Sequence, residues 1–262
     1  IEKFPYKSVG KAQEKIDDYS AAYTACYSAY STNSSWKTFL TAVDKAAKSK
    51  DLDPSLVAYY KYYVALVYGK SYSVQLKYLN EMKAQGDTYE SVYLPCYAEL
   101  YLGQKKYSKV FSTCDEMLTY NNQDVYGYVY RSAAYRLKGE YAIAYKTCSE
   151  GLKIAGDDPL LCYQMSIIEL LYGKNDLAFK YVKIAYEDAE NELSYLQASS
   201  LYALCAYIKG DTTTYDSINS DVTSNGYTIA DQVTAYENGK TDVKTIFTTN
   251  GGDFTWTAST SS

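Results

Sequence analysis

A glycine recurs through the middle of the chain at a nearly constant spacing. Gly69, Gly103, Gly139, Gly173 and Gly210 follow one another at intervals of 34, 36, 34 and 37 residues. Each glycine comes after an apolar, aromatic stretch and before a polar and then apolar one. A fixed period of this length is typical of arrays built from one repeated supersecondary unit, and it constrains the fold more than any other feature of the sequence.

Apolar residues on both sides of these glycines have helical rather than alternating spacing. The segment AAYRLKGEYAIAYKTCSEGL (133–152) is followed by IELLYGKNDLAFKYVKIAY (168–186), with glycine in the matching place. Glycine at such a point allows the positive φ that ends a helix, and DLDP, NNQD and GDDP mark the linkers between units. The tyrosine-rich stretch YYKYYVALVYGKSY (59–72) is therefore predicted to be a helix in the repeat core, not a strand or a ligand-binding strip.

The repeat resembles the tetratricopeptide repeat (TPR) family, in which 34-residue helix–turn–helix units stack. The match is best at Ala134, Tyr135, Gly139, Tyr141, Ala144 and Gly151. The sequence departs from the family pattern at Ala65 and Asn175, where an aromatic residue is usual. The resemblance implies an all-α fold: a right-handed α-solenoid of about five antiparallel helix pairs with a C-terminal capping segment.

We predict that the TPR-like array occupies residues 1–224 and that a capping helix and polar tail occupy residues 225–262. The repeats are expected at approximately 10–49, 55–88, 90–121, 124–155 and 159–190, with a further pair near 193–224. Repeat arrays need an element that covers the last apolar face. Helices over 229–237 and 242–247 are expected to do this through Ile229, Val233, Tyr236, Val243, Ile246 and Phe247. The final GGDFTWTASTSS is expected to fray or to lead into another domain.

Composition argues against several classes of chemistry. The chain has no histidine, and the only arginines are Arg131 and Arg136. Its formal net charge of -5 gives no basic footprint for nucleic acid, and no apolar run is long enough to cross a membrane. The six cysteines lack metal-binding spacing and are expected to be free, buried thiols. We therefore expect no catalytic residues, no metal and no cofactor, and neither nucleic-acid binding nor membrane insertion by this segment.

In the family that the chain resembles, the first helix of each pair lines a concave groove. The family's groove positions, carried over residue by residue, give Tyr93, Tyr97, Leu100, Tyr101, Tyr126, Val129, Ala133, Arg136, Tyr163, Ile167, Leu170, Gln197, Ser200 and Leu204. The partner-binding candidates among them are Tyr93, Tyr97, Tyr101, Tyr126, Arg136, Tyr163 and Gln197. The family's carboxylate-clamp residue types are absent here apart from Arg136, which favours a peptide anchored by apolar side chains. Each tyrosine could instead belong to the core between repeats.

We predict a non-catalytic scaffold that binds a peptide or protein partner in this groove. Two alternatives stay open: a structural spacer within a larger cell-surface protein, or a peptide-sensing regulatory module. Abundant Tyr, Ser, Thr and Asn with few arginines resembles exported bacterial proteins, many of which carry such repeats behind a lipoprotein anchor. The cell envelope or the exterior is therefore expected, with the cytoplasm as the alternative that six thiols favour. Because the sequence begins at Ile1 rather than Met, we expect a trimmed piece of a longer protein.

Overall fold

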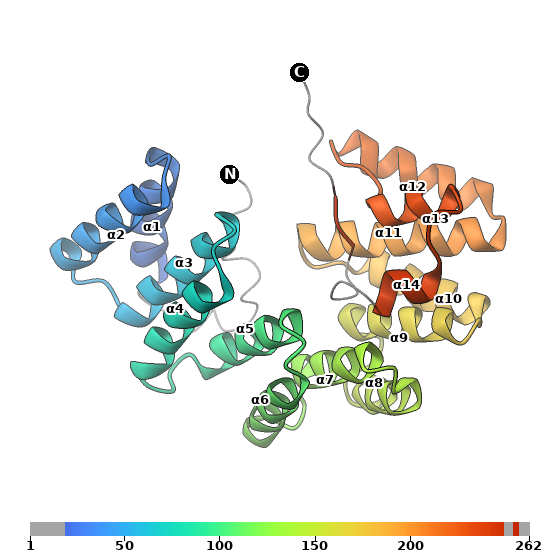
Figure 1. The fold of residues 1–262 in the computed structure, drawn as a ribbon, viewed down its shortest axis with the longest axis horizontal. Helices are drawn as coiled ribbons and strands as arrows, with labels where there is room; N and C mark the ends of the chain where they lie inside the picture. The colour runs from blue at the N-terminus through green and yellow to red at the C-terminus, as the bar shows by residue number, and fades with distance from the viewer. Residues whose placement is uncertain (1–18, 249–253, 257–262) are drawn as a thin grey trace. The chain divides into compact units, whose positions relative to one another are not determined.

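The computed structural model describes residues 19–248 and 254–256, whose regular secondary structure is α-helix with no strand among them (Figure 1). The part of the first predicted repeat before residue 19 lies outside this range. The helices within it are α1 (Tyr19–Thr32), α2 (Trp36–Lys50), α3 (Pro54–Val67), α4 (Tyr72–Ala84), α5 (Glu90–Gly103), α6 (Tyr107–Tyr120), α7 (Val125–Leu137), α8 (Tyr141–Ala155), α9 (Pro159–Leu171), α10 (Asn175–Glu187), α11 (Glu192–Lys209), α12 (Thr212–Ser224), α13 (Asp231–Glu237) and α14 (Val243–Thr248). Consecutive helices pack on each other as α1–α2, α3–α4, α7–α8, α9–α10 and α11–α12, and α5 and α6 stand between the second and third of these pairs along the chain.

Acidic and amide side chains begin the first helices of several pairs. The Asp53 carboxylate accepts a hydrogen bond from the Ser55 amide at 2.7 Å, and Pro54 occupies the first turn of α3. Asp158 caps α9 in the same way, ahead of Pro159. These caps satisfy amides that have no partner within the helix. The predicted linkers DLDP and GDDP therefore end in the cap and first residue of the next helix.

Four of the five recurring glycines end a first helix or its turn in the left-handed conformation. Gly69, Gly139, Gly173 and Gly210 have φ between 59° and 80°. The prediction is wrong for Gly103, which is the last residue of α5, because the left-handed residue of that turn is Lys105 at φ 57°. The turn after α5 therefore comes two residues later than the glycine spacing indicates.

The chain divides into two compact units, residues 1–109 and 110–262, and the boundary falls inside α6. In the first unit α1 packs on α2 and α3, and α3 packs on α4. Tyr59, Tyr60 and Tyr62 are buried in α3, and the Tyr59 ring makes edge-on contacts with those of Tyr60 and Tyr63. The stretch is thus helical, as predicted, and its first half is core, whereas Leu66, Val67 and Tyr72 are exposed.

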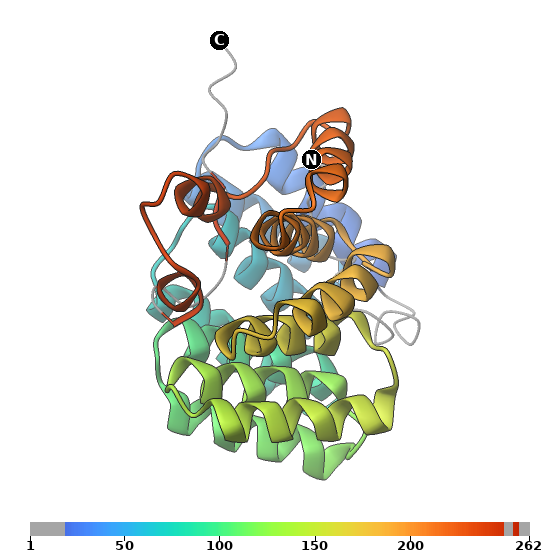
Figure 2. The ribbon, with the colours of Figure 1, turned by 90° about the vertical axis from the view of Figure 1, so that its right-hand side faces the viewer.

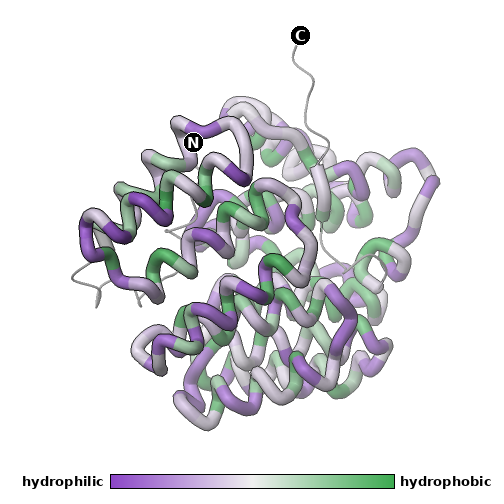
Figure 3. The backbone as a smooth tube through the Cα atoms, turned by 60° about the vertical axis from the view of Figure 1, so that its left-hand side comes forward, coloured by the Kyte–Doolittle hydropathy of each residue, from purple (hydrophilic) through white to green (hydrophobic). Residues whose placement is uncertain are grey.

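In the second unit small residues let paired helices approach closely. The Ser132 hydroxyl of α7 donates to the Ala144 carbonyl of α8 at 3.0 Å, and Ser166 of α9 does the same to Ala178 of α10 at 2.8 Å. At Gly151 in α8 there is no room even for a methyl group. Figure 3 shows hydrophobic and hydrophilic stretches alternating along the helices, as expected when each helix buries one side.

Tyrosine hydroxyls join neighbouring repeats within each unit. Five of them bond to a group that lies 34 to 36 residues away in sequence, which is about one repeat. The pairs are Tyr68 with the Asn33 carbonyl, Tyr89 with Asp53, Tyr163 with Gln197, Tyr186 with Asp221 and Tyr227 with Glu192. Tyr163 and Tyr186 bond forward to the next pair, and Tyr68 and Tyr89 bond back to the preceding one. Tyr227 joins the C-terminal segment to the start of α11. Each phenol can combine contact through its apolar ring with a polar bond through its hydroxyl.

The C-terminal segment, defined here as residues 227–248 and 254–256, carries the two short helices expected there, α13 and α14. The segment covers apolar surface on several helix pairs, not on the last pair alone. Helix α13 packs on α11, whereas α14 packs on α9 and α7 (Figure 2). The segment therefore runs along the first helices of three successive pairs in the second unit.

No helix in residues 19–248 or 254–256 is long and apolar enough to cross a bilayer. The division into an array at 1–224 and a cap at 225–262, with the repeat limits given above, remains a prediction.

Candidate functional site

The three partner-binding candidates of the first unit lie on α5, and two of them are buried. Tyr93 is 0% exposed and Tyr97 is 6% exposed, whereas Tyr101 is half-buried. Their rings follow one another along the helix, at centroid distances of 6.0 Å between Tyr93 and Tyr97 and 5.9 Å between Tyr97 and Tyr101. The Tyr97 hydroxyl donates to the Asn80 amide oxygen of α4 at 2.6 Å. Tyr97 therefore faces the preceding helix.

The later turn after α5 explains this orientation. In α3, α5 and α7, the side chain eight residues before the left-handed turn residue bonds to the helix that precedes it in the chain. The bonds are Lys61 to Asp44, Tyr97 to Asn80 and Arg131 to Asp115. Groove positions in α5 that are counted back from Gly103 therefore fall two residues too early. Two residues correspond to a rotation of about 200° around the helix axis. Tyr97 thus takes the place that Lys61 and Arg131 take in their own pairs.

The four candidates of the second unit are brought together only in part. The Tyr163 hydroxyl of α9 donates to the Gln197 side-chain oxygen of α11 at 2.8 Å, and both residues are half-buried. Tyr126 of α7 is half-buried and stacks on Tyr130 one turn later, at 6.2 Å. Arg136, near the end of α7, is 1% exposed. As a set of ligand contacts, all seven residues remain a prediction.

The C-terminal segment covers the face formed by α7, α9 and α11, which we call the first-helix face. One hydrophobic cluster combines residues of that face, Ile167, Leu170 and Leu204, with residues of the segment. The segment contributes the buried side chains of Ile229, Ala230, Val233, Ile246, Phe247 and Phe254. The Phe247 and Phe254 rings meet edge to face at 5.5 Å. Burial of these apolar side chains is the main attraction between the segment and the face.

Two buried polar side chains of the first-helix face bond to the backbone of the segment. The Ser200 hydroxyl of α11 accepts a hydrogen bond from the Ala230 amide at 3.0 Å. The Arg136 guanidinium donates to the Phe247 carbonyl. Because a buried polar group without a partner is costly, both bonds help to fix where the segment lies.

The stretch around Phe254 is docked, so its predicted fraying is wrong for residues 254–256. The Thr255 carbonyl accepts from the Asp231 amide, and the Thr255 amide donates to the Gln232 side chain, each at 3.0 Å. The burial of Phe254 in the cluster could not be predicted from the sequence, since one aromatic in a polar tail gives no periodic signal. The groove positions Arg136, Ile167, Leu170, Ser200 and Leu204 do lie beneath the segment.

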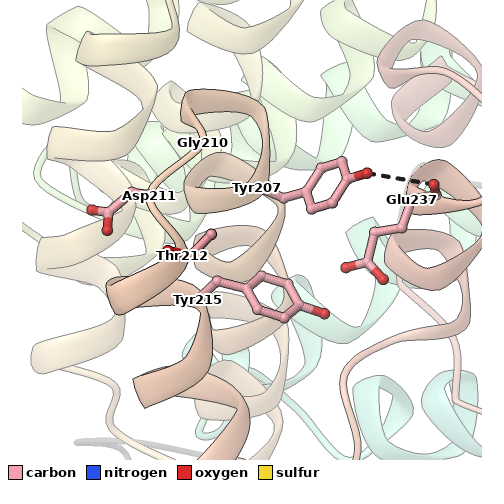
Figure 4. Close-up of a pocket in the computed structure, with 6 residues that line it drawn as sticks. All are labelled: Tyr207, Gly210, Asp211, Thr212, Tyr215 and Glu237. Atoms are coloured by element: carbon pink, nitrogen blue, oxygen red, sulfur yellow. Dashed lines mark hydrogen bonds between the residues drawn. The ribbon is translucent and has the colours of Figure 1, made fainter.

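A cleft of about 270 Å³ lies beside the segment, where the end of α11 and the start of α12 meet the end of α13 (Figure 4). It is lined by Tyr207, Gly210, Asp211, Thr212, Tyr215 and Glu237. The Tyr207 hydroxyl lies 3.5 Å from the Glu237 carbonyl, to which it donates. Burial and a hydrogen bond to the Glu237 carboxylate raise the pKa of the Tyr215 phenol.

The polar side chains in this cleft make hydrogen bonds that stabilise the fold. The Asp211 carboxylate caps α12 by accepting from the Thr214 amide and hydroxyl, and these bonds lower its pKa. A phenol with a raised pKa and a capping carboxylate are poor nucleophiles and poor bases near neutral pH. The cleft therefore suits contact with an apolar or aromatic side chain better than it suits bond-making chemistry.

No known family's sequence profile matches the chain, and none of the curated proteins compared with it matches in sequence. Solved structures do match in fold. A thermophilic TPR protein of Thermus thermophilus superposes with a TM-score of 0.52 at 18% identity, covering 70% of this chain and 98% of its own. PilF of Pseudomonas aeruginosa gives 0.52 at 12% identity, covering 78% of this chain and 91% of its own.

PilW, described as a widely conserved type IV pilus biogenesis factor, gives a TM-score of 0.54 at 13% identity, covering 80% of this chain and 94% of its own. Identities this low carry information about the fold alone. The helix pairs within each unit, the left-handed turn residues and these superpositions agree with one another. The chain has the TPR fold: an all-α solenoid of stacked helix pairs with a C-terminal segment that covers apolar surface.

Proposed function

We propose that the chain is a non-catalytic interaction scaffold that binds a segment of a protein partner across the first helices of its pairs. The observation that carries the proposal is the first-helix face of the second unit, which already holds a polypeptide segment. Apolar side chains such as Phe247 anchor that segment, and Ser200 and Arg136 bond to its backbone. A surface with these properties satisfies the requirements of peptide recognition: apolar pockets and main-chain hydrogen bonds.

The chemistry of the side chains supports a role without catalysis. The chain contains no histidine, and its cysteines are free thiols. Burial raises the pKa of Cys148 and Cys205 to about 12, so these thiols are protonated and weakly nucleophilic. Within the part of the chain that the structure describes, no three acidic, cysteine or histidine residues converge as a metal site would require.

The cell envelope is the location that we propose for this scaffold. The support is composition, which resembles exported bacterial proteins, and the fold likeness to PilW, which is described as a pilus biogenesis factor. A protein partner at the envelope would fit both observations.

Site-specific photo-crosslinking tests the proposed binding face. The residue three positions before the left-handed turn residue is Leu66 in α3 and Tyr207 in α11, and these side chains are 41% and 46% exposed. A photoreactive amino acid at either position should form an adduct with a partner in the cells that encode the protein. Matched controls at Ile154 of α8 and Leu177 of α10, which are similarly exposed on second helices, should not. Adducts spread equally over all four positions would contradict the proposal.

A further inference from the structure

The C-terminal segment occupies the first-helix face in the way that a bound peptide would. We infer that it is a built-in competitor, and that the face beneath it binds a partner segment of the same chemistry after the C-terminal segment is displaced. The inference rests on the proposed function and deepens it, because it names the kind of partner. It draws on contacts within the second unit only.

The segment is built so that it can leave without unfolding a repeat. It contains α13 and α14, which have only 7 and 6 residues. Helices this short are not stable alone in water, so their structure depends on docking. The segment follows α12 and Gly226 along the chain, so it contains none of the paired helices. Release therefore breaks contacts with α7, α9 and α11 but leaves their own pairings with α8, α10 and α12.

Release would uncover a surface of defined chemistry. Its apolar floor consists of Ile167, Leu170 and Leu204, which share one cluster with the segment. At one end lies the Arg136 guanidinium, which now donates to the Phe247 carbonyl, and at the other lies the Ser200 hydroxyl, which now accepts from the Ala230 amide. The uncovered face thus offers one cationic donor and one neutral acceptor on either side of aliphatic residues.

The C-terminal segment itself shows what such a face accepts. Ile246 and Phe247 enter the cluster side by side, near the end of α14. The carbonyl that Arg136 holds belongs to the last turn of that helix, where main-chain carbonyls have no partner within the helix. The partner that fits is therefore an amphipathic protein segment with an aliphatic–aromatic pair at the end of a short helix, whose terminal carbonyls or carboxylate meet Arg136.

Exchange of a labelled peptide into the full chain tests the inference. The probe is a fluorescein-labelled peptide of residues 227–248, and its binding is measured by fluorescence anisotropy. The chains compared are native, Phe247→Ala and Ile143→Ala, where Phe247 is 0% exposed in the cluster and Ile143 is exposed on α8. We expect the peptide to bind the Phe247→Ala chain at least tenfold more tightly than it binds the other two. A probe peptide that itself carries Phe247→Ala should lose this binding.

Hydrogen exchange shows whether the variant is folded. In the Phe247→Ala chain, amides of α13 and α14 should exchange faster while those of α8 to α12 keep their protection. If this variant loses its helical signal, Phe254→Ala replaces it, since Phe254 also belongs to the segment and contacts the Phe247 ring. Equal peptide binding by all three chains, or no binding by a folded variant, would overturn the inference.

The two proposals fail in different ways. Peptide exchange without any partner adduct at Leu66 or Tyr207 would overturn the proposed function and would leave the segment displaceable. If adducts form at those positions but the peptide does not exchange, the competitor role of the C-terminal segment is refuted and the proposed scaffold function stands.

Discussion

Replacement of Gly151 by alanine would test whether close helix contact or helix propensity controls stability in the second unit. Gly151 lies inside α8, where alanine is favoured over glycine by about 1 kcal/mol. The added Cβ, however, would lie 2.9 Å from the Tyr128 Cβ and 3.0 Å from both methyl groups of Leu161. Tyr128 belongs to α7 and Leu161 to α9, so the added Cβ would press against both helices on which α8 packs.

The balance of these two effects gives a direction and a size. Overpacking a tight core typically costs about 1–3 kcal/mol, and Leu161 is fully buried, so it has little freedom to move. After subtraction of the gain in propensity, we expect Gly151→Ala to lower the free energy of unfolding by about 1 kcal/mol. In a unit of this size that corresponds to a fall in Tm of about 2–4 °C.

A second glycine provides the matched control. The three atoms nearest to the Cβ added in Gly127→Ala all belong to Leu118, and its Cγ would lie 2.7 Å away. Because Leu118 is half-buried, it can rotate toward solvent, so the net change should stay within about 0.5 kcal/mol. Urea unfolding followed by far-UV circular dichroism measures both variants. A Gly151→Ala chain more stable than the native one would show that propensity dominates and that the packing argument is wrong.

Three further predictions concern polar contacts and thiols. Hydrogen bonds from Tyr195 and Tyr186 lower the pKa of Asp221 in the folded protein. The ionised carboxylate therefore stabilises the fold fully above the unfolded pKa of about 3.9, and this stabilisation is lost as the pH falls through the lower folded pKa. In Asp221→Asn the free energy of unfolding should fall less steeply as the pH is lowered, and an unchanged pH dependence would contradict this. Burial raises the pKa of Cys148 and Cys205 to about 12, so a chromogenic disulfide reagent should label them only as the chain unfolds, and immediate labelling would show that they are accessible. Tyr97→Phe removes the bond to Asn80 and should lower the free energy of unfolding by about 1 kcal/mol in urea; no change would mean that the bond contributes nothing.

The helices and their order could be predicted from the sequence because local chemistry determines them. Proline after aspartate at 53–54 and at 158–159 begins a helix through a cap that the same residues supply. Gly139 and Gly173 end their turns because the left-handed conformation favours glycine. The same rule fails after α5, where Lys105 adopts that conformation. A lysine gives no such signal, so the groove register of α5 could not be read from the glycine spacing.

The candidate site was less predictable because it depends on contacts between segments distant in sequence. Arg136 could be placed on a first helix, but its bond to Phe247 spans 111 residues. Ile246 and Phe247 could be identified as apolar residues that need cover, yet their sequence does not say which face they cover. Tyrosine adds a further ambiguity, since Tyr97 and Tyr163 suit both a wet groove and a buried contact with a hydrogen bond.

The tyrosine ties between neighbouring repeats have a consequence for the conditions that the fold tolerates. The ties from Tyr89 to Asp53 and from Tyr186 to Asp221 use a neutral donor in place of a second charge. Salt screens pairs of exposed opposite charges strongly, but it acts only weakly on a short hydrogen bond from a phenol. Burial and the hydrogen bond to Asp221 raise the pKa of the Tyr186 phenol, so this donor keeps its proton in alkaline solution. Coupling between these repeats should therefore persist from dilute buffer to concentrated brine, where an array held by lysine–glutamate pairs would loosen.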